Sequence, residues 1–159
     1  MLRITKLSDY AVVVLQNLAA CQDPSCDCTS REVAERTGIP RPTVSKVMKD
    51  LARGGLLVSQ RGALGGFCLA REPARITLAE IIEAVEGPIA LTECSAAADG
   101  NCDFTGACPV EENWLRINQV VRRALDDISL ADMARPLSRS LVNLGRSPLG
   151  EPAAASEEP

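Results

Sequence analysis

The 159-residue sequence predicts a mainly α-helical fold: a winged helix-turn-helix with a small β-hairpin wing, a cysteine loop and a long C-terminal helix. Three observations lead to this prediction. Two short amphipathic segments flank a glycine turn, a glycine-rich hairpin follows them, and a later segment has heptad spacing. The chain divides accordingly into a winged-helix unit at 1–88, a cysteine loop at 89–109, a dimerisation-helix region at 110–135 and a disordered tail at 145–159.

Capping residues and apolar spacing set the expected helix boundaries. A first helix is expected over residues 8–20, capped by Ser8. The run Thr29–Glu32 is a capping box that opens a second helix, and Gly38 supplies the left-handed residue at its end. A third helix is expected over about 42–53, because proline is favoured at the first helical position. Its buried stripe consists of Val44, Val47, Met48 and Leu51.

A hairpin and two further helices follow. Strands are expected over 56–61 and 67–70, joined by a loop whose glycines permit positive φ. A second capping box, Thr77–Glu80, opens a fourth helix that ends at Gly87. A long helix is expected over about 110–128, where apolar residues recur with the 3,4 spacing of a dimerisation seam. The seam consists of Trp114, Ile117, Val121, Ala124 and Ile128.

Composition excludes several classes of protein. The absence of histidine excludes Ser-His-Asp triads and Cys-His dyads, and no acid–base pair or cofactor loop is visible, so we do not expect an enzyme. We recognise neither an apolar run of about 18 residues for a membrane span nor a signal peptide, and we expect a cytoplasmic protein. Residues 1–75 carry a net charge of +4 and residues 76–159 a net charge of −8, which suits a basic face for nucleic acid in the first half.

The expected ligand of the winged-helix unit is a double-stranded DNA operator. The second helix of a helix-turn-helix enters the major groove, where short polar and basic side chains can meet base edges and phosphates. The hairpin tip is placed to approach a minor groove. The alternative is an ordinary solvated helix face. The expected DNA contacts are Arg41, Thr43, Ser45, Lys46, Lys49, Arg61 and Gly62.

Cysteine content points to metal chemistry. Seven cysteines are an odd number, and a reducing compartment disfavours a disulfide framework. Cys94, Cys102 and Cys108 are separated by seven and five residues, and thiolates bind soft metals and iron–sulfur clusters. Zinc usually takes four ligands at tighter spacing, so the pattern favours a cluster with an unusual fourth ligand. Three unrelated thiols or a zinc site are the alternatives.

Two sets of segments carry a resemblance to known proteins. The first set, residues 3–11, 43–49, 54–57 and 61–67, resembles the IscR/NsrR-type iron–sulfur transcription regulators, and the resemblance covers about residues 1–135. Within that family, residues 80–94, 108–110 and 129–133 look most like the regulator of the SUF iron–sulfur assembly operon.

This resemblance implies a winged-helix homodimer that holds an iron–sulfur cluster on Cys94, Cys102 and Cys108 of each subunit. We expect a 2Fe–2S cluster in preference to a 4Fe–4S cluster. Cluster occupancy would change DNA affinity and so control iron–sulfur assembly genes, with the assembly machinery as the cluster source. Relatives take their fourth ligand either from a histidine three residues after the third cysteine, here Glu111, or from an aspartate of the partner's first helix, here Asp9. We favour Asp9 over Glu111.

Two rival functions stay open. A thiol-redox or zinc-dependent regulator without a cluster would be colourless when purified without oxygen. An iron–sulfur carrier or assembly enzyme would lack sequence-specific DNA affinity, and the helix-turn-helix argues against it. Cys21, Cys26 and Cys28 lie outside the ligand pattern of the family, and they are either incidental thiols or a second redox or metal site.

Overall fold

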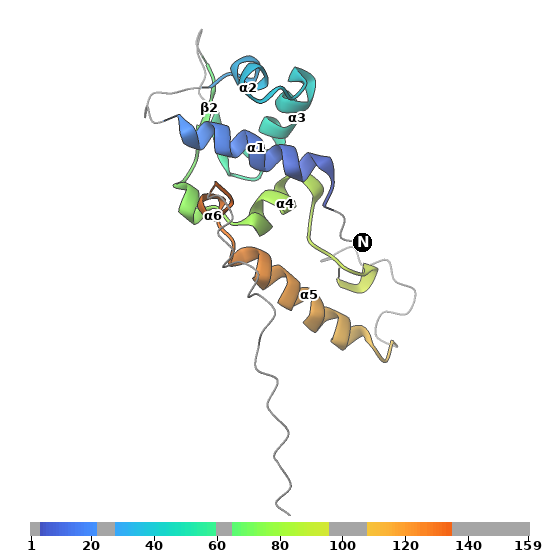
Figure 1. Ribbon diagram of the computed structural model, residues 1–159. Helices are drawn as coiled ribbons and strands as arrows, with labels where there is room; N and C mark the ends of the chain where they lie inside the picture. The colour runs from blue at the N-terminus through green and yellow to red at the C-terminus, as the bar shows by residue number, and fades with distance from the viewer. Residues whose placement is uncertain (1–3, 22–27, 60–64, 96–107, 135–159) are drawn as a thin grey trace, which may run out of the picture.

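The computed structural model describes residues 4–21, 28–59, 65–95 and 108–134. These residues form a mainly helical structure with one small antiparallel sheet, as predicted (Figure 1). None of the described helices is long and apolar enough to cross a membrane. The elements in chain order are α1 (Lys6–Ala20), α2 (Ser30–Thr37), α3 (Arg41–Arg53), β1 (Leu57–Ser59), β2 (Phe67–Leu69), the 3₁₀ helix η1 (Pro73–Arg75), α4 (Leu78–Glu86), the 3₁₀ helix η2 (Glu93–Ser95), α5 (Glu111–Asp126) and α6 (Leu130–Ala134).

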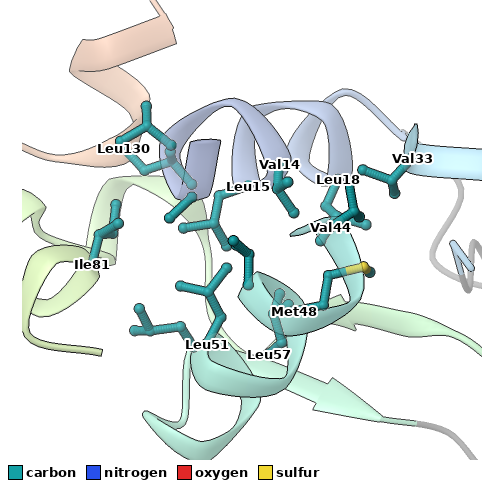
Figure 2. Close-up of a cluster of buried hydrophobic side chains, with 14 of the residues drawn as sticks. Val14, Leu15, Leu18, Val33, Val44, Met48, Leu51, Leu57, Ile81 and Leu130 are labelled. Carbon is teal, nitrogen blue, oxygen red and sulfur yellow. The ribbon is translucent and has the colours of Figure 1, made fainter. Parts of the chain in front are cut away.

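The hydrophobic core forms around α1, which lies across the middle of the molecule and contacts α2, α3, α4 and α6 (Figure 1). Val14 and Leu15 of α1 are 0% exposed, and Figure 2 shows them among side chains from α3, α4 and α6. Burying one such side chain stabilises the fold by about 1.5–3 kcal/mol. The predicted stripe of α3 is confirmed, since Val44, Val47, Met48 and Leu51 are all 0% exposed.

Both predicted capping boxes are present. The Thr29 hydroxyl accepts a hydrogen bond from the Glu32 amide, and the Glu32 carboxylate accepts one from the Thr29 amide. Thr77 and Glu80 make the same reciprocal pair at the start of α4. Gly38 ends α2 with a φ of 72°, a left-handed conformation that glycine adopts without steric cost. These local signals therefore place the helix-turn-helix where the sequence predicts it.

The start of α1 differs from the prediction. Thr5, not Ser8, is the N-cap: its hydroxyl accepts from the Leu7 amide, and the helix begins at Lys6. Ser8 lies inside the first turn, only 2% exposed, and its hydroxyl donates to the Glu86 carboxylate at 2.9 Å. The Thr5 hydroxyl donates to the same carboxylate, and these two hydrogen bonds, that of Thr5 foremost, lower the pKa of Glu86. The first turn of α1 is thereby fastened to the end of α4.

The described part of the wing is hydrogen-bonded to the residue before the α2 cap. Strands β1 and β2 pair over residues 57–59 and 67–69, and the rest of the predicted first strand, residues 60 and 61, lies outside the described residues. The Cys28 amide donates to the Phe67 carbonyl at 3.2 Å, and the Phe67 amide donates to the Cys28 carbonyl at 3.0 Å. Two hydrogen bonds therefore join the base of the wing to the segment that leads into α2.

The chain returns to the core after α5. Ile128, predicted on the long helix, lies beyond its end, because its carbonyl accepts from the Leu78 amide at 2.8 Å and so belongs to the turn toward α6. The short helix α6 is not predicted from the sequence. Its Leu130 is 0% exposed and packs in the same core as α1 (Figure 2).

Helices α3 and α4 meet at a glycine. A Cβ atom built on Gly54 would lie 2.7 Å from the Cβ atom of Ala84, so the contact excludes a larger side chain. We expect Gly54→Ala to lower the free energy of unfolding by about 1–3 kcal/mol, measured by urea denaturation, because the two helices must separate. The double variant Gly54→Ala/Ala84→Gly should lose less than the sum of its single variants. Strict additivity of the two effects would contradict a steric contact.

Candidate DNA interface and metal-binding region

Helix α3 carries the predicted DNA contacts on its exposed side and flanks. Arg41, Lys46 and Lys49 are exposed, and Thr43 and Ser45 are half-buried. The opposite side of α3 is the buried stripe that packs against α1. Because the stripe is fully buried, the polar side has one orientation, toward solvent. The side chains that the sequence selects on this helix therefore share one surface.

Asp50 moderates the charge of that surface. Its carboxylate pairs with Lys46 at an N–O distance of 3.1 Å and with Arg53 at 3.1 Å. Exposed ion pairs are worth about 0–1 kcal/mol, so a phosphate can replace the carboxylate at little cost. In the part of the chain that the structure describes, Arg41 and Lys49 are in no ion pair. Their charges are thus available to an anionic ligand.

The predicted contacts at the tip of the wing, Arg61 and Gly62, lie outside the described residues. The structure describes the base of the wing, where the Leu57–Leu69 pair closes the strands. The contribution of the tip to DNA binding stays a prediction.

The three predicted cluster cysteines are described to different extents. Cys108 is half-buried three residues before the start of α5, and its carbonyl accepts from the Glu111 amide at 3.3 Å. Cys94 lies within η2, where only its backbone is described, and Cys102 is outside the described residues. Among described side chains, no group of three or more metal-binding residues comes together.

Asn118 joins the Cys94 segment to the helix that follows Cys108. Its side-chain amide nitrogen donates to the Ile89 carbonyl at 3.0 Å, and its side-chain oxygen accepts from the Leu91 amide at 3.0 Å. Helix η2 packs against α5 directly after this clamp. Two thiol-bearing segments are therefore held on adjacent elements, and thiolates are the donors that iron–sulfur clusters take. Asn118 could not be selected from the sequence, because one polar residue within an apolar seam carries no local signal of a distant hydrogen bond.

The two candidate fourth ligands lie on different elements. Asp9 is exposed in the first turn of α1, and Glu111 is half-buried in the first turn of α5. The helix dipole also favours a carboxylate at either place, so the alternative to a ligand role is an ordinary acidic residue in a first helical turn. Glu111 shares a segment with Cys108, whereas Asp9 is presented to solvent by another part of the molecule.

Helix α5 exposes an apolar face. None of its residues is buried in the single chain, and Trp114 and Ile117 of the predicted seam are 39% and 44% exposed. Ala124 is exposed and Val121 is half-buried. Two further apolar residues of α5 outside the predicted seam, Leu115 and Val120, are 39% and 60% exposed. Trp114, Ile117, Val120 and Ala124 follow one another at spacings of three or four residues and so share one side of the helix, and exposed apolar side chains of this kind mark an interaction surface.

The Asn118 clamp generates a testable expectation. In Asn118→Ala the Leu91 amide loses its acceptor, and its hydrogen exchange should accelerate about fivefold, the effect of a hydrogen bond worth about 1 kcal/mol. Asn113→Ala is the matched control, since Asn113 is an exposed asparagine on the same helix. Equal exchange rates of the Leu91 amide in both variants would contradict the clamp.

Comparisons with known proteins agree with this architecture. The sequence model of the Rrf2 family, described as iron-dependent transcriptional regulators, matches residues 4–136. The HTH-type transcriptional repressor NsrR of Streptomyces coelicolor is 29% identical over 150 residues, which cover 94% of this chain and 100% of the relative.

Solved structures give the same result. CymR, the global cysteine regulator of B. subtilis, superposes with a TM-score of 0.62 at 28% identity, covering 84% of this chain and 97% of CymR. IscR of T. potens superposes with a TM-score of 0.59 at 26% identity, covering 88% of this chain and 96% of IscR. These relatives are transcription regulators and not enzymes. The chain therefore belongs to the Rrf2 family of DNA-binding transcriptional regulators.

Proposed function

We propose that this Rrf2-family protein is a homodimeric transcription regulator that senses an iron–sulfur cluster and controls SUF-type cluster-assembly genes. The observation that carries the proposal is the Asn118 clamp, which holds the segment leading into Cys94 against the helix that begins after Cys108. The same chain presents basic and short polar side chains on α3. A thiol-bearing region and a DNA-reading helix are thus parts of one small structure.

The proposed cluster ligands are Cys94, Cys102 and Cys108 of each subunit. Their thiolates fit an iron–sulfur cluster, for which we favour the 2Fe–2S type, supplied by the assembly machinery. A bound cluster would supply a redox-active, labile group whose presence depends on iron and sulfide supply. Asp9 is the preferred fourth ligand, because its exposure leaves it accessible to the cysteine loop of a second subunit. Glu111 is the alternative.

In the proposed complex, α3 of each subunit lies in the major groove of one operator half-site. Arg41, Lys46 and Lys49 would contact phosphates, and Thr43 and Ser45 would contact base edges. The wing tip, with Arg61 and Gly62, would approach the minor groove. Such a regulator acts in the compartment that holds the DNA, the cytoplasm of a bacterial cell.

The exposed apolar face of α5 is the proposed dimer interface, with Trp114 as its largest side chain. Residues 1–88 would then act as the DNA-binding unit, 89–109 as the cluster-binding loop and 110–135 as the dimerisation region. Residues 145–159 would contribute a tail without a packed core.

A second candidate function is a thiol-redox or zinc-dependent regulator without a cluster. The likeness to CymR, a global cysteine regulator, favours it. Absorption spectroscopy separates the two candidates, because thiols and zinc give no visible bands.

We expect protein purified without oxygen to be coloured, with stoichiometric iron and sulfide, and Cys108→Ser to lose the visible bands. Cys68→Ser is the matched control, because Cys68 lies on β2 of the wing and outside the proposed ligand set. Asp9→Ala should shift the bands and Glu111→Ala should not. The reverse result would transfer the ligand role to Glu111. A colourless protein that cannot be reconstituted but still binds its operator would overturn the cluster proposal.

The α3 surface is tested by the salt dependence of operator binding. Lys49→Ala should weaken binding to all sequences and lower the slope of log affinity against log salt by about 1, because one phosphate contact is lost. Arg116→Ala is the control, since Arg116 is exposed on α5, away from α3. An equal change of slope in both variants would show that Lys49 contributes only to the overall charge.

A further inference from the structure

Two thiols that the proposed function does not use meet where α1, α2 and the wing join. The Sγ atoms of Cys21 and Cys28 lie 3.2 Å apart. Cys21 is half-buried directly after the last residue of α1. Cys28 is 1% exposed and directly precedes Thr29, the cap of α2. The pair is thus built into the DNA-reading unit.

Arg36, in the last turn of α2, contacts both sulfur atoms. Its Nη1 donates to Cys21 Sγ at 3.1 Å and to Cys28 Sγ at 3.5 Å. These hydrogen bonds, that to Cys21 foremost, raise the pKa of Arg36. A guanidinium is charged at any physiological pH. A guanidinium beside a thiol favours the thiolate, which is the nucleophilic form of cysteine. Because Cys21 is half-buried, its thiolate can meet and attack an oxidant that arrives from solvent. The sulfur of the buried Cys28 lies 3.2 Å from that of Cys21.

We propose that Cys21 and Cys28 form a redox site, distinct from the cluster cysteines, that a hydroperoxide oxidises to an intramolecular disulfide. The Cys21 thiolate attacks the O–O bond, forms a sulfenic acid and releases hydroxide, or an alkoxide from an organic peroxide. The Cys28 sulfur then attacks the sulfenic sulfur, the S–S bond forms, and the leaving hydroxide takes the Cys28 proton as water. In total, two thiols and one hydrogen peroxide give one disulfide and two waters, and the sulfurs supply the two electrons.

The bond would act on the elements that read DNA. A disulfide has an S–S distance of about 2.05 Å, so the two sulfurs must approach by about 1 Å. The Cys28 backbone is hydrogen-bonded to Phe67, the first residue of β2, so this movement reaches the base of the wing. Arg36, in the last turn of α2, would also lose the Cys21 thiolate as its partner, because a disulfide carries no charge. We expect oxidation to change operator affinity by at least about fivefold, the lower end of typical coupling between sites.

The disulfide can be mapped in the full-length protein because aspartates separate its cysteines. Reduced protein is treated with equimolar hydrogen peroxide, remaining thiols are alkylated, and the chain is cleaved before aspartate. Cleavage before Asp23 and Asp27 places Cys21, Cys26 and Cys28 in three different peptides. We expect peptide 9–22 linked to peptide 27–49. A link to peptide 23–26 instead would overturn the assignment, as would irreversible oxidation without any link.

Variants test the part played by each group. Cys28→Ser should form no link, whereas Cys26→Ser should form the same link as the unaltered chain. Arg36→Gln should slow oxidation roughly tenfold, and Arg36→Lys should recover part of the rate, because the cation is restored. Arg31→Gln is the matched control, since Arg31 lies on the same helix and pairs with Glu35 instead. Circular dichroism verifies that each variant is folded. An unchanged rate in Arg36→Gln would overturn the role of the guanidinium.

The coupling to DNA is tested by comparing oxidised protein with identically treated Cys28→Ser. Damage to the cluster cysteines is common to both samples, so a larger change of operator affinity in the unaltered chain comes from the Cys21–Cys28 bond. Equal changes would overturn the coupling. Because the link is mapped on cysteines outside the cluster loop, failure of this proposal and failure of the cluster proposal give different results.

Discussion

The packing of α1 is the constraint on which the rest of the structure depends. This one helix contacts four others, and its Val14 and Leu15 are fully buried among them. Replacing such a leucine by alanine usually costs 2–5 kcal/mol, a large part of the stability of a small domain. With α1 in place, α3 can present only one side to solvent, and α4 and α6 each occupy a defined position. The orientation of the proposed DNA-binding surface is therefore determined by the core behind it.

Much of the fold can be predicted from local signals. The capping boxes at Thr29 and Thr77, the left-handed Gly38 and the buried stripe of α3 depend on residues within a few positions of one another. The features that escape prediction depend on distant partners. Ser8 has the chemistry of a cap, but its hydroxyl bonds to Glu86, 78 positions away. The burial of Leu130 cannot be predicted from its short segment, because the surface that buries it is supplied by the distant helix α1.

The candidate sites show the same difference between local signals and distant partners. The polar side of α3 follows from helix phase alone, so the sequence predicts which of its residues lie outside the buried stripe, and their contact with DNA stays a prediction. The exposed apolar residues of α5 are more numerous than those in the 3,4 template, which selects one narrow stripe and therefore omits Leu115 and Val120. The sequence selects the three proposed cluster cysteines by type and spacing. The Asn118 clamp joins residues 27 and 29 positions apart and has no counterpart in any short motif.

The attachment of α5 at two points has a consequence for how a dimer would place its two α3 helices on the half-sites of an operator. Asn118 holds the helix to the segment before η2, and the chain beyond the helix is anchored by Leu130 in the core of the same subunit. A helix fixed in this way cannot swing independently of the body that carries α3. In a dimer joined through α5, the position of α3 relative to α5 would be fixed within each subunit. A signal would then act by tilting whole subunits about their common axis, and the operator would select among these tilts by its half-site spacing.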